Sequence, residues 1–160
     1  MTDLRTLMAG HRFFEGLDDV RLDTIASCGE VVELRAGAQL AREGEPADRF
    51  YAIRSGHVAV GSHLPHRGSV TVATVGPGEL LGWSWLLAPH RWHFDAVTIE
   101  PVSALAFDAA RLRTAIAADD GLNLEWTRRV AGVMSRRLAA ARLQLLDLYA
   151  TSHPETRRDS

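Results

Sequence analysis

Residues 37–60 read GAQLAREGEPADRFYAIRSGHVAV, a segment in which glycines separate short runs of strand-forming residues. One run contains Phe50, Tyr51 and Ile53, and the next begins at His57 after a Ser55-Gly56 turn. Aromatic and β-branched residues bounded by glycine and proline are typical of short strands joined by tight turns. The segment therefore predicts consecutive antiparallel strands.

The same pattern extends on both sides of this segment. Short strand-like runs recur from Glu30 to about Val75, and DAVTIEPVSALAF at 95–107 predicts two more strands. Closely spaced strands predict a mainly β fold, an antiparallel β-roll of the jelly-roll or cupin-like type, over about residues 30–107. Helical spacing before the roll predicts an N-terminal helix that begins near Asp18 or Asp19, either of which can serve as its cap.

From Asp108 to about residue 150, the period becomes helical and predicts two closing helices. In the second and longer helix, an apolar seam recurs in steps of three and four residues: Leu124, Thr127, Ala131, Met134, Leu138, Ala141, Leu145 and Leu148. This seam predicts a parallel helix pair in a homodimer, with the interface at Met134, Leu138, Ala141, Leu145 and Leu148. The alternative is that the seam packs on the chain's own roll. The polar residues 151–160 predict a disordered tail.

Composition limits the possible functions. The length of 160 residues suits one domain, expected over 1–150, and the net charge of −2 provides no general attraction to nucleic acid or to an anionic membrane surface. A lone cysteine, Cys28, with no signal peptide and no apolar span, favours a soluble cytoplasmic protein. No motif of a hydrolase or nucleotide-hydrolysing enzyme is present, so we expect no enzymatic activity.

Together with GPGELLG at 76–82, the glycine pattern closely resembles the cyclic nucleotide-binding domain of the catabolite activator protein family. The resemblance covers about residues 13–150 and implies a regulatory domain of bacterial signalling. In that family, the stretch after the lead-in binds the cyclic phosphate. It provides a short helix, an arginine that neutralises the phosphate and a glutamate that holds the ribose hydroxyl.

Residues 82–95 read GWSWLLAPHRWHFD and depart from that family pattern. The resemblance places Trp83 at the glutamate position, His93 at the arginine position and Phe94 at the following small hydroxyl position. Arg91 stands two residues before the arginine position, and a shifted loop would be needed to bring it to the phosphate. The family's threonine and serine contacts to adenine fall on Ala141 and Arg142. We therefore expect ordinary cyclic AMP binding to be weak or lost.

The candidate ligand-binding residues combine aromatic and polar side chains. Trp83, Trp92 and Phe94 would stack on a ligand, while Ser84, Arg91 and His93 would anchor it. Each has a structural alternative: the tryptophans, above all Trp85, can be core, Ser84 can cap the short helix, and Asp95 can pair with Arg91 and His93. The full set is Gly82, Trp83, Ser84, Arg91, Trp92, His93, Phe94, Ala141 and Arg142.

These observations predict a small-molecule-sensing domain that signals through a helix-paired dimer. The alternative is a ligand-free protein-interaction module in which the aromatic stretch is core. No metal site is expected, since His90 and His93 have suitable spacing only on a helix. Haem, which some members of the wider family hold, is disfavoured, and no cofactor is certain. Regulators of the family continue into a winged helix-turn-helix after the long helix, so without that module we expect a separate output protein and no direct DNA binding.

Overall fold

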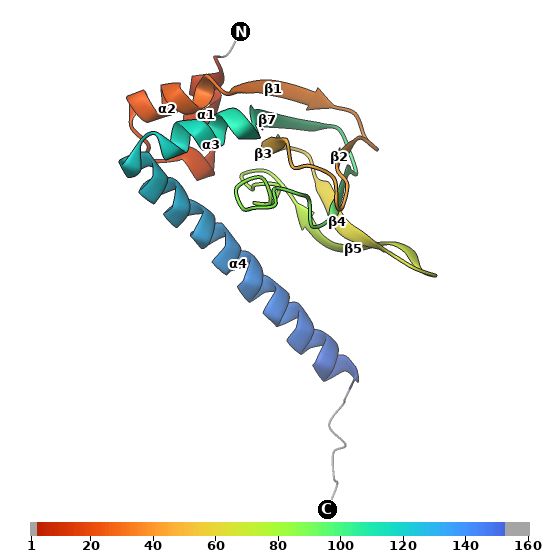
Figure 1. Ribbon diagram of the computed structural model, residues 1–160. Helices are drawn as coiled ribbons and strands as arrows, with labels where there is room; N and C mark the ends of the chain where they lie inside the picture. Colours follow the sequence, from red (N-terminus) through yellow and green to blue (C-terminus); the bar gives the residue numbers. More distant parts are fainter. Residues whose placement is uncertain (1–2, 153–160) are drawn as a thin grey trace, which may run out of the picture. The chain divides into compact units, whose positions relative to one another are not determined.

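The computed structural model describes residues 3–152, and its strands form two antiparallel sheets (Figure 1). The predicted mainly β architecture with flanking helices is confirmed. A three-stranded sheet has the order β1 (Gly29–Leu34), β7 (Val102–Asp108), β3 (Arg49–Ser55). A four-stranded sheet has the order β2 (Gln39–Ala41), β6 (Asp95–Thr98), β4 (Val58–Leu64), β5 (Gly68–Val75).

Strand β7 is the centre of the three-stranded sheet. Leu105 lies opposite Val31 of β1 and Ala52 of β3, and every residue from Val102 to Phe107 is buried. A strand that is buried on both faces reads as a continuous apolar run, which is the pattern of VSALAF. The sequence DAVTIEPVSALAF thus forms β6 and β7 as predicted.

Five helical segments are present in the part of the chain that the structure describes. They are α1 (Leu4–Ala9), η1 (Arg12–Phe14), α2 (Asp19–Ala26), α3 (Ala109–Ala117) and α4 (Asp120–Ser152). Asp18 caps α2, since its Oδ1 accepts a hydrogen bond from the Arg21 N–H at 2.9 Å. The helix predicted to open the domain is therefore α2, but α1 and η1 precede it. Strand β2 was likewise not predicted.

Aromatic rings from η1, β3, β7 and the turn that contains Trp85 pack together in the core of the first unit. Phe50 of β3 lies 5.6 Å from Phe107 of β7 and 4.8 Å from Trp85, measured between ring centroids, and Phe14 of η1 lies 5.7 Å from Phe107. All four side chains are almost fully buried. Each such ring removes on the order of 150–250 Å² from water, so this cluster contributes strongly to stability.

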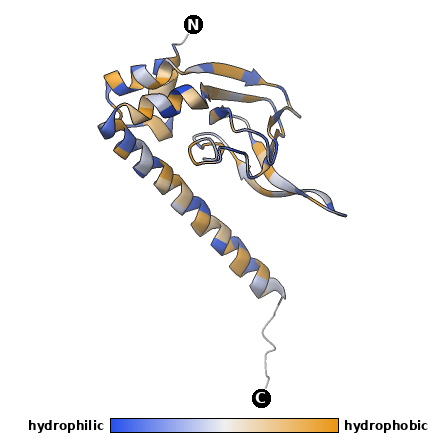
Figure 2. Ribbon diagram, viewed as in Figure 1, coloured by the Kyte–Doolittle hydropathy of each residue, from blue (hydrophilic) through white to orange (hydrophobic). Residues whose placement is uncertain are grey.

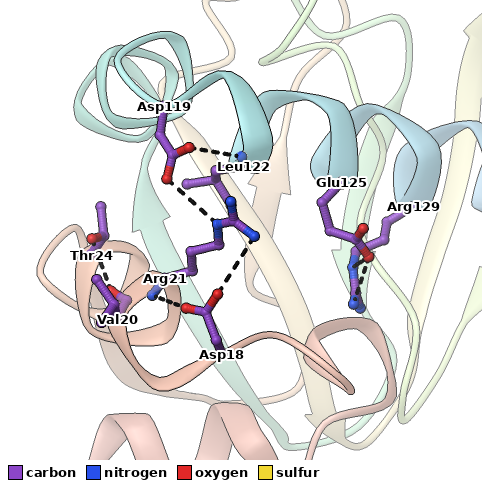
Figure 3. A network of polar contacts seen from close by, with 8 residues as sticks. All are labelled: Asp18, Val20, Arg21, Thr24, Asp119, Leu122, Glu125 and Arg129. Carbon is purple, nitrogen blue, oxygen red and sulfur yellow. Dashed lines mark hydrogen bonds and ion pairs between the residues drawn. The ribbon is translucent and has the colours of Figure 1, made fainter.

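A polar network joins α2 to the start of α4 (Figure 3). Arg21 lies 3.5 Å from Asp18 and 3.5 Å from Asp119, while Asp119 accepts the Leu122 N–H at 3.1 Å. The hydrogen bond from Leu122, followed by the contact with Arg21, lowers the pKa of Asp119 below its ordinary value. Asp119 therefore caps α4 and connects this cap to α2.

The chain divides into two compact units after Asn123, so most of α4 forms the second unit. Within it, Arg129 and Glu125 form an ion pair at 3.0 Å (Figure 3). Hydrophobic residues recur along α4 (Figure 2), and Leu138, Leu145 and Leu148 are 73%, 67% and 64% exposed.

The polar tail expected over 151–160 lies largely outside the described residues. Its first two residues, Thr151 and Ser152, are helical and end α4, so the prediction was wrong for these two. None of the helices in residues 3–152 is both long and apolar enough to span a membrane.

Candidate functional site

The lead-in 76–82 runs beside β3 and places Gly82 at its end. The Ile53 N–H donates to the Glu79 carbonyl at 2.9 Å, and the Leu81 N–H donates to the Tyr51 carbonyl at 2.9 Å. Leu80 and Leu81 are buried, which anchors this segment in the core. The position of the following residues, 82–95, which we name the cassette, is therefore set by backbone pairing.

The cassette forms turns instead of the short helix that the resemblance implied. The Leu86 N–H donates to the Trp83 carbonyl at 3.0 Å, but no helix is assigned between residues 83 and 90. Pro89 supplies no N–H and disfavours helical backbone at the residue before it, so a helix cannot extend through this point. His90 then adopts a left-handed conformation with φ 57°.

Two aromatic rings cover Gly82. A Cβ added at Gly82 would lie 2.7 Å from Phe94 Cζ and 3.4 Å from Trp92 Cζ3. The ring centroids of Trp92 and Phe94 are 5.6 Å apart, Trp92 is buried and Phe94 is half-buried. Gly82, Trp92 and Phe94 thus lie together, and the space over the Gly82 backbone is occupied by rings.

The other cassette side chains divide between core and partly accessible positions. Trp85 is fully buried against Phe50, and its carbonyl accepts a hydrogen bond from Arg113 of α3. Trp83, at the glutamate position, is half-buried, whereas Ser84 is 2% exposed. With no cassette helix present, Ser84 does not have the helix-capping role that was considered for it.

Arg91 is directed to the loop between β2 and β3. Its Nη1 donates to the Gly44 carbonyl at 2.8 Å, and the side chain is otherwise exposed. Backbone bonds from the Trp92 N–H to the Glu45 carbonyl and from the Ala47 N–H to the His90 carbonyl, at 2.9 and 2.7 Å, hold the same two segments together.

Asp95 has a different role from the one expected. Its Oδ1 accepts the Glu43 N–H at 2.8 Å, and no ion pair with Arg91 or His93 is found among residues 3–152. The loop at 43–47 is therefore a structural part of the site that the sequence did not identify. The only local signal for it was the glycine and proline in GEP, which predicts a turn but no partner.

Tyr51 is a second neighbour that the sequence did not link to the cassette. It lines a groove of about 320 Å³ together with Trp92, Arg42, Glu45 and Arg49. Burial raises the pKa of the Tyr51 hydroxyl above its ordinary value.

The remaining predicted residues are two histidines of the cassette and two residues of α4. His93 is exposed and His90 half-buried, and no group of three or more His, Cys, Asp or Glu side chains in the described chain is arranged to hold a metal ion. Ala141 and Arg142 belong to α4 in the second unit, and both are exposed. Their contribution to a ligand site stays a prediction.

The sequence of the chain is similar to that of a known bacterial regulator. The chain is 28% identical over 148 residues to a CRP-like cAMP-activated global transcriptional regulator of Mycobacterium tuberculosis. The match covers 92% of this chain and 64% of that protein, so the chain spans less than two thirds of its relative's length.

Solved structures share the fold. A Geobacter metallireducens protein assigned to the cyclic nucleotide-binding proteins superimposes with a TM-score of 0.76 at 28% identity, covering 86% of this chain and 99% of that one. The catabolite activator protein of Thermus thermophilus gives a TM-score of 0.66 at 25% identity, covering 86% and 63% of the two chains. Residues 31–119 match the family described as cyclic nucleotide-binding domain. Since that match extends over more than half of the sequence, this chain belongs to the cyclic nucleotide-binding domain family.

Proposed function

We propose that this chain is a small-molecule-sensing regulatory domain in which the cyclic AMP site is altered or lost. The observation that carries the proposal is the pair of aromatic rings over Gly82. Phe94 stands where the resemblance places a small hydroxyl residue, and its ring contacts the glycine backbone. The nearby guanidinium of Arg91 is engaged with the Gly44 carbonyl.

The energetic consequence follows from the chemistry of phosphate recognition. A buried phosphate needs charge-assisted hydrogen bonds, and losing such a partner costs about 2–5 kcal/mol. Phe94 offers no hydrogen bond, and His93 lacks the permanent charge and the bidentate donor geometry of an arginine. We therefore expect cyclic AMP affinity to be lower by roughly two orders of magnitude or more than a matching cassette would give.

The accessible chemistry of the cassette suits an aromatic or apolar ligand. Trp83 and Phe94 are half-buried, so part of each side chain is accessible to a ligand, and His93 supplies a polar group at the surface. Ligand binding would shift the population of conformations of a dimer formed through α4, without enzymatic chemistry. In this proposal, the protein works in the cytoplasm and passes its signal to an output partner.

One observation favours a second candidate, a ligand-free protein-interaction module. Trp85 and Trp92 are 0% and 4% exposed, and Ser84 is 2% exposed, so much of the cassette is already core. In this alternative, the rings stabilise the roll and the domain functions only by docking a partner.

A thermal-shift series with cyclic AMP, cyclic GMP and haem tests the proposal. Wild type should show no stabilisation by micromolar cyclic nucleotide. The triple variant W83E/H93R/F94S restores the family's side chains at the three cassette positions. It should gain roughly 5–10 °C at about a hundredfold excess of cyclic AMP over its Kd.

Stabilisation of wild type by micromolar cyclic AMP, abolished in Arg91→Ala, would overturn the proposal. A library of aromatic small molecules separates the two candidates: quenching of tryptophan emission that is lost in Phe94→Ala supports sensing. A complete lack of ligand-induced change supports the interaction module.

A further inference from the structure

A second groove, which none of the residues after Gly82 lines, lies beside α1 and η1 in the first unit. It has a volume of about 550 Å³ and is bounded by the end of α1, by η1, by the end of β3 and by the Pro77-Gly78 turn. Small-molecule sites commonly have volumes of about 300–1,000 Å³. We name it the His11 groove, after one of the residues that line it.

His11 fixes the geometry of this groove. The ring is 5% exposed, its Nε2 donates to the Ile53 carbonyl at 2.9 Å and its Nδ1 accepts the Phe13 N–H at 3.2 Å. Both nitrogens are therefore used within the protein. Burial, more than any other cause, lowers the pKa of His11, so the ring is neutral at physiological pH and contributes no charge to the groove. Its role is to hold η1 against β3.

The charge of the groove comes from two arginines. Arg12 follows His11 in η1, Arg54 follows Ile53 in β3, and both line the groove, whereas none of the lining residues is acidic. Neither guanidinium forms an ion pair with any described carboxylate. Two guanidinium groups thus line the His11 groove, and none of its lining residues carries a negative charge.

Arg12 lies against a glycine backbone, and Arg54 is held by a hydrogen bond. A Cβ added at Gly78 would lie 3.1 Å from Arg12 Nη2, which places the Arg12 guanidinium against the glycine backbone. Arg54 Nη1 donates to Ser103 Oγ at 2.9 Å, and Ser103 Oγ in turn donates to Glu33 Oε1 at 2.8 Å. A guanidinium has five N–H donors, so Arg54 keeps donors for a ligand.

We propose that the His11 groove binds a small molecule through an anionic group, a phosphate or a carboxylate, that contacts Arg12 and Arg54. Planar guanidinium groups match the oxygen geometry of both anions. The limited volume fits a small molecule better than an extended acidic peptide. This site is separate from the cassette and does not depend on the function proposed for it.

Amide and arginine side-chain NMR shifts of the full chain test this site. Pyrophosphate represents phosphate ligands and citrate represents carboxylates, each added at constant ionic strength. We expect saturable shifts at Gly10, Ser55 and Gly78 for at least one probe. Arg12→Ala should weaken that binding by about tenfold or more, because it removes a charge-assisted contact. Arg67→Ala, which removes an exposed arginine from the β4–β5 turn, is the matched control and should bind as wild type does.

A variant of the second arginine, Arg54→Gln, tests its contribution separately. Arg54→Gln should also weaken binding by about tenfold, and its melting temperature shows whether loss of the Ser103 contact has unfolded it. The proposal is overturned if Arg12→Ala and Arg67→Ala bind equally. It is also overturned if neither probe gives saturable shifts up to about 10 mM, where even weak sites fill. The cassette variants leave this readout unchanged, so failure here is distinguishable from failure of the sensing proposal.

Discussion

Gly82 combines two constraints that act on the same α-carbon. Its φ of +72° lies in the left-handed region, which side-chain-bearing residues rarely adopt, and the Phe94 ring occupies the space where a Cβ would lie. The first constraint is a property of the backbone and the second of its surroundings. A glycine with a similar φ but no neighbouring ring can separate the effects of the two constraints.

We predict that Gly82→Ala destabilises the protein more than a left-handed conformation alone explains. The left-handed conformation costs a residue with a Cβ about 1–2 kcal/mol of unfolding free energy, and the clash with Phe94 adds about 1–3 kcal/mol. Gly37→Ala is the control, since Gly37 has φ +81° but no atom near its missing Cβ. Urea denaturation measures both variants. Equal losses of unfolding free energy would show that the ring does not press on Gly82.

At the same scale, the sequence grouped the cassette residues as candidates but did not identify all of their partners. Trp92, Phe94 and Gly82 are close in sequence, so their association could be expected. Arg91 bonds to a residue 47 positions away and Asp95 to one 52 positions away. Such contacts depend on strand register and loop position, which a local pattern does not specify.

At the scale of elements, the start of α4 depends on one carboxylate. Asp119 accepts the Leu122 N–H and contacts Arg21 of α2, so removing it exposes an unsatisfied helix end and breaks the connection to α2. We predict that Asp119→Ala lowers the melting temperature, whereas Asp119→Asn, whose side-chain oxygen still accepts the N–H, lowers it less. Asp147→Ala, on an exposed part of α4, is the control and should leave it unchanged.

The same carboxylate gives a pH dependence of known sign. Because the pKa of Asp119 is lowered in the folded state, its contribution is present above the unfolded value of 3.8 and is lost as pH falls through the folded value. The difference in melting temperature between wild type and Asp119→Asn should therefore shrink under acid conditions. A constant difference from neutral to strongly acid pH would contradict this assignment.

The elements that the sequence did not predict are short or lack a local period. Helix α1 has six residues and β2 has three, too few for a hydrophobic repeat to be recognised. The cassette helix was expected from the resemblance, but the cassette forms turns, and Pro89 disfavours helical backbone at residue 88. The longer strands and α4 were predictable because their patterns extend over several repeats.

For the whole molecule, the exposed apolar side of α4 predicts a homodimer. Leu138, Leu145 and Leu148 share one seam and are mostly exposed in the single chain, an arrangement typical of helices that pair. Burying a leucine contributes about 1.5–3 kcal/mol, so several in one seam can stabilise a dimer.

We predict that wild type is a dimer in light scattering and that Leu138→Glu combined with Leu145→Glu raises its dissociation constant by at least about a hundredfold. Leu143→Glu changes a leucine that is 63% exposed but off the seam, and it should leave the dimer intact. A wild-type mass of 17.6 kDa at all protein concentrations would show that the seam has no partner.

The hydrogen bond between the Arg113 guanidinium and the Trp85 carbonyl has a mechanical consequence for the first unit. Trp85 belongs to the turn that follows Gly82, and Arg113 belongs to α3, whose last residue, Ala117, is three positions before α4 begins. A molecule that displaces this turn therefore either moves α3 as well or breaks the hydrogen bond between Arg113 and Trp85. A displacement of the aromatic rings would therefore be transmitted along the cassette backbone to Trp85. From Trp85 it would pass through this hydrogen bond to α3, the helix that precedes α4.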